Sequence, residues 1–359
     1  MRANLLVMAI CAWLSNSGAA HSAEPFPGID PLWILVHEPG VIAELNLTAA
    51  EQKAFQKLTD DLDLRVFPLR NKPRDVMLPG LTKVFEDLQA GLKSVLSSNQ
   101  FKRLNEIYMR RLGTNALLRD DVAAKMRYSD TQRKEIEKII TETQTSVTAL
   151  EKEASEGKPR EPVEKKYIAL RTDEQKRIIK LLKPNQQMAW RELVGSDFEM
   201  AKLGRAAFKA PELVNTNDWI NSSPIKLQEL HGKVAVIHFY ACGCINCIHN
   251  YPWYHEWHDA FKDKGVVLIG IHSPETMSER DSANVRKKAA AEKFQFPVLI
   301  DGKSENWDAW GNSMWPSVYL IDKHGYLRQF WPGELNWQGS NGEKYMREWI
   351  ERLAAEPNT

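Results

Sequence analysis

The chain has 359 residues, which is enough for about two domains of ordinary size. Its 48 basic side chains nearly balance 47 acidic ones, so the net charge is +1; this argues against nucleic acid as the main partner, because phosphate binding needs a concentrated basic face. With 43% hydrophobic and 26% charged residues, the composition excludes a wholly disordered chain. Four cysteines are too few for a disulfide-stapled scaffold, yet three of them fall between positions 242 and 247.

The first 23 residues have the pattern of a secretory signal peptide. Arg2 supplies a positive charge, residues 5–14 are apolar but too short to span a bilayer, and small residues follow up to Ala23. Cleavage after Ala20 or Ala23 would remove Cys11 and leave the remaining cysteines in the periplasm or another exported, oxidising location. The alternatives are an uncleaved membrane anchor and a lipid attached to Cys11.

Residues 24–205 are predicted to form an all-α module. Apolar residues recur there at helical spacing with charged residues between them, as in the run from Ile136 to Leu150. Proline and glycine residues interrupt the pattern at 68–80 and 156–162, and we expect loops over both stretches.

A short polar pattern recurs through this module, in which Ser or Thr is followed three residues later by Glu or Gln. The copies are Thr48–Glu51, Ser97–Gln100, Ser129–Gln132 and Thr172–Gln175, and residues 182–186 form a degraded copy. Such a capping box satisfies free amides at a helix N-terminus, so each copy predicts a helix start. The phrases also resemble the LTxxQ repeats of Spy-type helical periplasmic proteins, which act as chaperones or stress sensors.

After about residue 210, strand patterns alternate with helical ones. Strands are predicted at 234–239, 266–271, 296–300, 318–321 and 326–330, and helices at 245–262, 282–294 and 343–355. The last two strands form a hairpin across the turn that contains Gly325. The sequence therefore predicts a layered α/β domain that follows the all-α module.

The segment Cys244-Ile245-Asn246-Cys247 follows the first strong strand and opens the helix predicted at 245–262. Free amides and the positive end of the dipole stabilise a thiolate at a helix N-terminus. Cys244, at the helix tip, is therefore the predicted nucleophile. Cys247 lies about one turn further on and is predicted to attack the resulting mixed disulfide.

Residues 211–355 resemble the TlpA/DipZ-like redoxin family, which has a thioredoxin fold and thiol-disulfide oxidoreductase activity. The resemblance is carried by residues 238–249, in which CINC is the redox pair, by Pro252, and by the segments 271–275, 315–322 and 332–334. It implies that Pro316 is a cis-proline that faces the redox pair and shapes a peptide groove with Trp315. It also implies protein thiols or disulfides as clients, a separate redox partner protein and no bound cofactor.

Three positions depart from the pattern of that family. His238 stands where thioredoxins carry a buried acid that assists the resolving thiol, and Asn250 stands where many relatives have an acidic residue. An imidazole at position 238 either carries protons or packs as a neutral core residue. Cys242 is an additional thiol, which is either free or an alternative disulfide partner.

Three other functions remain open at this point. Cys242, Cys244 and Cys247, with histidines nearby, are soft ligands that would suit a carrier of Cu(I) or Zn. A peroxidase of the peroxiredoxin type would carry Pro and Thr before its cysteine, and residues 236–241 contain neither. The third is a helical, chaperone-like binding protein that carries the redox domain as a regulator.

Overall fold

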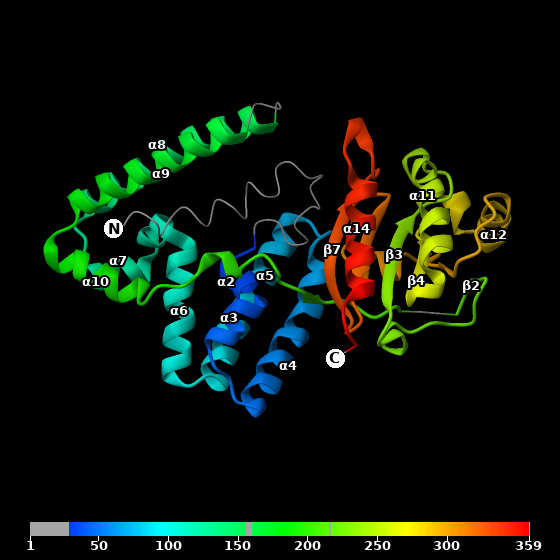
Figure 1. The fold of residues 1–359 in the computed structure, drawn as a ribbon, viewed down its shortest axis with the longest axis horizontal. Coiled ribbons are helices and arrows are strands. Elements are labelled where there is room, and N and C mark those ends of the chain that lie inside the picture. The colour runs from blue at the N-terminus through cyan, green and yellow to red at the C-terminus, as the bar shows by residue number, and fades with distance from the viewer. Residues whose placement is uncertain (1–28, 156–159, 215–216, 359) are drawn as a thin grey trace. The chain divides into compact units, whose positions relative to one another are not determined.

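The computed structural model describes residues 29–155, 160–214 and 217–358 (Figure 1). Contacts group these residues into two compact units: unit 1 comprises Asp30–Gln52 and Leu92–Ala206, and unit 2 comprises Lys53–Gly91 and the described residues from Ala207 onward. The composition of the chain does not predict that residues 53–91 pack with the C-terminal sheet. The predicted signal peptide and Cys11 lie outside the described residues.

Unit 1 is built from helices, as the periodicity predicts. Its helices are α2 (Pro31–Leu35), α3 (Pro39–Glu44), the start of α4 (Ala49–Val66), the end of α5 (Arg74–Val95), α6 (Ser98–Leu112), α7 (Asp120–Met126), α8 (Asp130–Ser155), α9 (Arg160–Leu181) and α10 (Pro184–Val194). The long helices α8 and α9 pack along each other (Figure 1). Within the described ranges, no helix combines the length and apolar character needed to cross a bilayer.

Three of the predicted capping boxes begin helices. At the start of α4, the Thr48 amide donates to the Glu51 carboxylate at 2.8 Å and the Glu51 amide donates to the Thr48 hydroxyl at 3.3 Å. The same reciprocal pairs join Ser97 with Gln100 before α6 and Ser129 with Gln132 before α8. Each box satisfies amides that the first helical turn leaves without partners.

The fourth box was a wrong prediction, because Thr172 lies inside α9 and begins no helix. The carboxylate of Glu174 is buried in unit 1, where it accepts hydrogen bonds from Arg171 at 3.1 Å and from the Thr114 hydroxyl. The degraded copy at 182–186 keeps one half of the box, in which the Lys183 amide donates to the Gln186 side chain at 2.9 Å as α10 begins.

Both predicted loops are shorter than expected. Helix α5 already begins at Arg74 and contains Pro79, although an internal proline costs a helix about 3 kcal/mol. Burial of Val84 and Leu88 on the same helix offsets part of that cost. Helix α9 begins at Arg160, so Pro162 occupies its first turn, where a missing amide costs little.

Unit 2 contains a mixed sheet in the order β1-β7-β6-β3-β4-β5-β2. Its strands are β1 (Phe208–Lys209), β2 (Trp219–Ile220), β3 (Val234–Tyr240), β4 (Val266–His272), β5 (Val298–Ile300), β6 (Ser317–Ile321) and β7 (Tyr326–Pro332). Strands β3, β4 and β5 are parallel, whereas β6 is antiparallel to both β3 and β7. The α/β architecture predicted for this part of the chain is confirmed.

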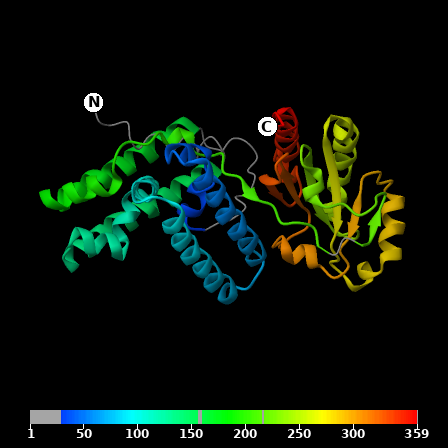
Figure 2. The same cartoon turned by 90° about the horizontal axis from the view of Figure 1, so that it is seen from below.

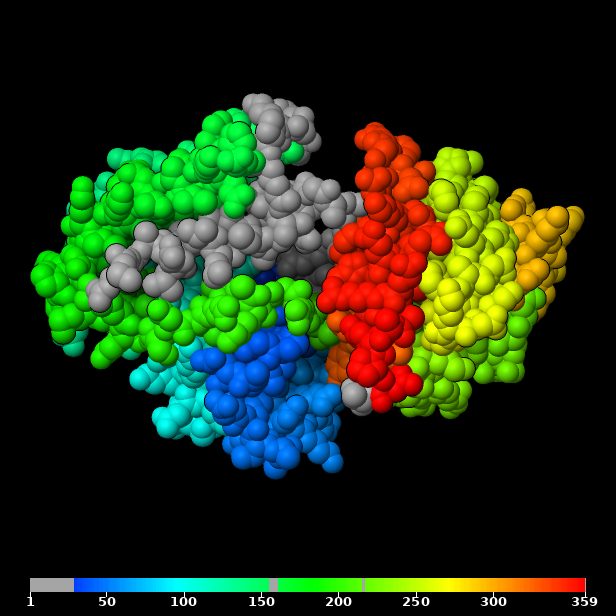
Figure 3. Space-filling view, viewed as in Figure 1, coloured from blue at the N-terminus to red at the C-terminus, as the bar shows by residue number. Residues whose placement is uncertain are grey.

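Helices cover both faces of the sheet in unit 2. On one face of the sheet, α11 (Ile245–Phe261) and α14 (Gly342–Ala355) lie side by side (Figures 2 and 3). They pack on alternate residues of β3 such as Val234 and Val236. On the other face, Phe239 contacts Trp310, which follows the short helix α13 (Glu305–Ala309). Helix α12 (Ser282–Ala291) connects β4 to β5. The central strand is therefore buried on both sides.

The turn between α4 and α5 belongs to the second face. Phe67 lies edge-on to Trp310, with ring centroids 6.2 Å apart. The Arg70 guanidinium donates to the Trp310 carbonyl at 3.0 Å and to the Tyr319 hydroxyl at 3.2 Å, and it lies 4.8 Å from the ring centroid of Phe330. Residues 53–91 therefore complete the core of the unit that carries the cysteines.

We expect the Arg70→Ala substitution to lower the free energy of unfolding by about 1.5–3 kcal/mol, because it removes charged hydrogen bonds from a half-buried site. Lys72→Ala is the matched control, since it removes a more exposed ion pair with Asp308 at 2.9 Å and should cost less than about 1 kcal/mol. Chemical denaturation followed by tryptophan fluorescence measures both. Equal losses in the two variants would contradict the proposed role of Arg70.

Candidate active site

The redox pair predicted from the sequence lies at the N-terminus of α11. Cys244 is the N-cap residue, and its carbonyl accepts from the Cys247 and Ile248 amides at 3.1 Å each. The Cys244 amide in turn donates to the Ala241 carbonyl at 3.2 Å, which closes the turn from β3 into the helix. Cys244 is half-buried, whereas Cys247 is fully buried. Only the first of the two thiols is open to a partner.

The two thiols differ strongly in acidity. The pKa of Cys244 is lowered to about 7, mainly by a hydrogen bond from the Cys247 thiol and also by the backbone amides of Cys247 and Asn246, while burial opposes the shift. Burial raises the pKa of Cys247 far above its usual range, and its hydrogen bond to Cys244 adds to this. Near neutral pH, a large fraction of Cys244 is therefore thiolate while Cys247 keeps its proton.

Cys242 has a different environment, although it lies only two residues before Cys244. Burial, the negative charge of Glu279 and a hydrogen bond to that carboxylate raise the pKa of Cys242 to about 11. Glu279 accepts from the Gly243 amide at 2.6 Å and from the Glu275 and Thr276 amides at 2.9 Å each. Burial raises the pKa of Glu279, but these amide hydrogen bonds outweigh it and the pKa is lowered.

Glu279 is a site residue that the sequence analysis missed. The one available signal is the spacing of Thr276 and Glu279, which matches a capping box and forms one at the start of a short 3-10 helix. The spacing does not reveal that the same carboxylate also binds the loop of the cysteines.

The bond between Trp315 and Pro316 is cis. Because Ser317 pairs with Phe239, Pro316 lies beside the end of β3, where the cysteine segment begins. The Trp315 indole donates to the Ser273 carbonyl at 3.0 Å and stacks on Trp307, with ring centroids 4.0 Å apart. The half-buried Trp315 ring is thus held at the edge of the sheet that carries the cysteines.

His238 lies on β3, fully buried against α11. Its ring stacks on Tyr254 with centroids 4.0 Å apart, and neither ring nitrogen has a hydrogen-bond partner among the described residues. Burial lowers the pKa of His238 to about 3, so the imidazole is neutral at physiological pH. Of the two interpretations of this position, the neutral core residue agrees better with these surroundings.

Asn250 contributes hydrogen bonds where many relatives have an acid. Its side chain is buried, donates to the Tyr254 hydroxyl at 3.1 Å and accepts from the Leu335 amide at 3.0 Å. It also lies 3.4 Å from the Gly333 carbonyl. Asn250 therefore ties α11 to the segment 332–334, which is one of the segments that carry the family resemblance.

The structure groups Cys242 with residues other than the two neighbouring cysteines. Single ligand atoms of Cys242, His272 and Glu279 all lie within 4.8 Å of one another. His249, which the sequence placed near the cysteines, instead pairs with Glu334 at 3.1 Å.

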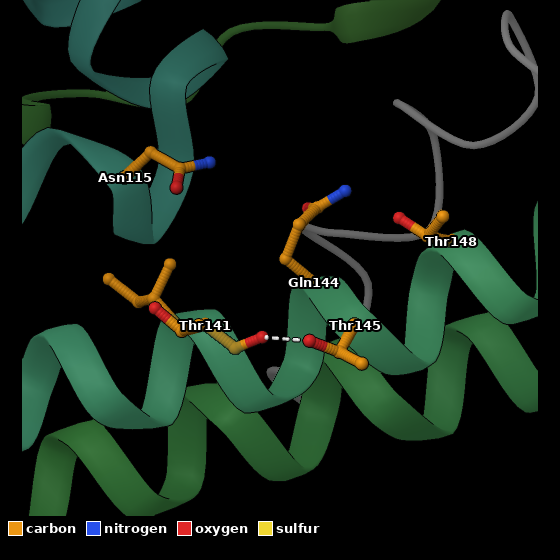
Figure 4. Close-up of a pocket in the computed structure, with 6 residues that line it drawn as sticks. Asn115, Thr141, Gln144, Thr145 and Thr148 are labelled. Atoms are coloured by element: carbon orange, nitrogen blue, oxygen red, sulfur yellow. Dashed lines mark hydrogen bonds between the residues drawn. The ribbon is translucent and has the colours of Figure 1, made fainter.

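A pocket of about 440 Å³ in unit 1 lies apart from this chemistry along the chain (Figure 4). It is lined by Asn115 and by Ile140, Thr141, Gln144, Thr145 and Thr148 of α8. The Thr145 hydroxyl is engaged in a hydrogen bond to the Thr141 carbonyl at 3.0 Å. Amides, hydroxyls and an aliphatic chain do not titrate near neutral pH, so these side chains supply neither a base nor a thiolate.

The C-terminal region of the chain is similar in sequence to known proteins. The model of the AhpC/TSA family matches residues 206–330. Protein DipZ of Mycobacterium tuberculosis is 39% identical over 132 residues, which are 35% of this chain but 19% of DipZ, so the chain spans about a fifth of that relative. Thiol-disulfide oxidoreductase ResA of Bacillus thuringiensis is 31% identical over 126 residues, which are 35% of this chain and 69% of ResA.

The chain is also similar to a solved structure. The crystal structure of a thioredoxin-like superfamily protein matches with 29% identity and a TM-score of 0.38, covering 42% of this chain and 97% of that one. The matches with DipZ and ResA confirm the resemblance that the sequence motifs carry. The chain therefore belongs, through its C-terminal region, to the TlpA/DipZ-like redoxin family of thiol-disulfide oxidoreductases.

Proposed function

We propose that the chain exchanges disulfides with protein clients, with Cys244 as the attacking thiol and Cys247 as the resolving thiol. The observation that carries the proposal is the difference between the two groups: Cys244 is accessible and its pKa is lowered to about 7, whereas Cys247 is fully buried with a raised pKa. An ionised sulfur at a helix N-terminus beside a protonated partner is the arrangement that thiol–disulfide exchange requires.

The reaction proceeds in two exchanges. The Cys244 thiolate attacks one sulfur of a client disulfide, so a Cys244–client disulfide forms and the second client sulfur leaves as a thiolate. Cys247 then attacks the sulfur of Cys244 and breaks that mixed disulfide. The proton of Cys247 passes to the client thiolate that departs in this step, and the first client thiolate takes a proton from water, which leaves a Cys244–Cys247 disulfide and a client dithiol. The same steps in reverse oxidise a client.

Proton transfer in this scheme does not involve His238. Its buried, neutral ring stacks on Tyr254 and has the surroundings of a packing residue. Asn250 carries no charge either, so the client sulfur itself is the acceptor for the Cys247 proton. Formation of the mixed disulfide removes the negative charge of Cys244, which is one of the causes of the raised Cys247 pKa.

We propose that Trp315 and Pro316 shape the groove for the client peptide. The Trp315 ring is only half-buried, and its contacts with Ser273 and Trp307 hold it in one orientation. A separate redox partner protein exchanges electrons with the Cys244–Cys247 pair, and no bound cofactor takes part. The oxidising, exported location that the N-terminal sequence predicts suits such a reaction. Within the all-α module predicted at 24–205, the helices of unit 1 (Asp30–Gln52 and Leu92–Ala206) serve in this proposal as a separate binding module.

Replacement of Cys244 by Ser should abolish insulin reduction, because no other described cysteine is both accessible and ionised at neutral pH. Cys247→Ser should instead accumulate a mixed disulfide with insulin, since the attacking thiol remains and the resolving one is gone. Turbidity and non-reducing gel electrophoresis follow the two outcomes. Cys242→Ser is the control and should keep substantial turnover; full turnover of Cys244→Ser would refute the assignment.

The alkylation rate of Cys244 should rise with pH with a midpoint of about 7, because only the thiolate reacts. Cys247→Ala should move that midpoint upward, since it deletes the thiol that donates to the Cys244 sulfur. Iodoacetamide labelling read by mass spectrometry in the Cys242→Ser background isolates this site. An unchanged midpoint in Cys247→Ala would contradict the proposed role of the hydrogen bond.

A further inference from the structure

A second group of side chains with ligand chemistry lies beside the redox pair and takes no part in the exchange described above. Strands β3 and β4 are parallel neighbours in which Tyr240 pairs with His272, so their carboxyl ends meet at one edge of the sheet. Cys242 lies two residues beyond the end of β3, and His272 is the last residue of β4. The segment that follows β4 returns Glu279 to the same place, where it binds the Gly243 amide.

The three groups are close enough to share an ion. One ligand atom of each residue, the sulfur of Cys242, a ring nitrogen of His272 and a carboxylate oxygen of Glu279, lies within 4.8 Å of the other two. A tetrahedral zinc ion holds sulfur at about 2.3 Å and nitrogen or oxygen at about 2.0–2.2 Å, so small side-chain movements bring the set to ligand distance.

The state of His272 is an independent observation that points to a ligand. Its side chain is 0% exposed, and neither ring nitrogen has a hydrogen-bond partner among the described residues. One of these unpartnered ring nitrogens lies within 4.8 Å of both the Cys242 sulfur and a Glu279 carboxylate oxygen. A buried polar group without a hydrogen-bond partner destabilises the folded state, so a bound ion at this ring nitrogen would remove that cost.

Hydrogen bonds hold the Glu279 carboxylate in a fixed position beside Cys242 and His272. Three backbone amides and the Thr276 hydroxyl, at 3.2 Å, donate to its two oxygens and keep it in place at the edge of the cluster. Such hydrogen bonds to a metal-binding carboxylate orient the ligand and tune its affinity.

We propose that Cys242, His272 and Glu279 form a binding site for a divalent zinc ion, separate from the Cys244–Cys247 pair. The mixed set of thiolate, imidazole and carboxylate suits Zn²⁺, since Cu(I) prefers soft ligands without a carboxylate. Binding replaces the proton of the Cys242 thiol by the metal, so one proton is released for each ion bound. A water molecule completes the fourth position of a tetrahedral site with three protein ligands.

The test is metal titration of the reduced full chain under anaerobic conditions. Zn²⁺ competes against a chromophoric chelator, and Co²⁺ serves as the optical probe, because a cobalt–thiolate bond gives a charge-transfer band. We expect one ion per chain, and we expect Cys242→Ser to weaken Zn²⁺ binding by at least about 100-fold and to remove the band. Glu279→Gln should weaken binding by at least about 10-fold.

The double variant Cys244→Ser, Cys247→Ser is the matched control and separates this site from a three-cysteine site. It should bind Zn²⁺ within about twofold of the unaltered chain and keep the cobalt band, although it has lost exchange activity. His249→Gln should likewise bind normally, because His249 pairs with Glu334 instead.

Three results would overturn the proposal: absence of stoichiometric binding by the unaltered chain, unchanged affinity in a folded Cys242→Ser variant, and loss of binding in the double variant. Far-ultraviolet circular dichroism checks the fold of each variant. Because the readout is metal affinity, failure of the zinc site leaves the disulfide-exchange assignment unaffected, and an inactive redox pair leaves the zinc site unaffected.

Discussion

The site depends on one hydrogen bond inside the first turn of α11, from the buried Cys247 thiol to the half-exposed sulfur of Cys244. This hydrogen bond shifts the two pKa values in opposite directions: it lowers the pKa of Cys244, which must ionise to attack, and raises the pKa of Cys247, which keeps its proton. The contact exists only because the chain turns directly from β3 into a helix, which places residues i and i+3 on one side of the turn.

That turn is held by the core beneath it. Tyr251, Tyr254 and Trp257 of α11 are buried against the sheet, and they belong to the same packed cluster as Cys247 itself. Aromatic side chains bury large areas and lose little conformational freedom, so they make a stiff support for the first turn. The neutral His238 belongs to this support, which gives a physical reason for its buried position on the central strand.

The parallel pairing of β3 with β4 also determines which side chains lie beside Cys244 and Cys247. Their ends bring Cys242 and His272 together, and Glu279 completes the cluster from the following segment. Cys242 and Cys244 are only two residues apart, yet the pKa of Cys242 is raised above the ordinary value of a thiol and that of Cys244 is lowered below it. The difference arises because one sulfur faces a carboxylate and the other faces a thiol and backbone amides. Three cysteines within six residues therefore do not act as one set.

The helices 53–91 show how composition and packing can disagree about domain boundaries. Their sequence is helical and charged like that of unit 1, and nothing local separates them from it. The contacts of Phe67 and Arg70 nevertheless cover β6 and β7 and join this hairpin to unit 2. The position of this hairpin follows from tertiary packing, because its side chains bury apolar residues on one face of the sheet that would otherwise be exposed to water.

The sequence by itself determined the features that arise within a few residues: the order of the five predicted strands and three predicted helices after residue 230, three capping boxes, and the placement of Cys244 and Cys247 at a helix start. Local patterns suffice there because hydrogen bonds and periodicity act between near neighbours. The short elements β2 and α13 were not predicted. Only the tertiary structure decided the buried, neutral state of His238, the continuation of α9 through Thr172 where a fourth box was predicted, and the meeting of Cys242, His272 and Glu279. These depend on burial and on contacts between distant segments, and no local pattern encodes the electrostatic cost of burial.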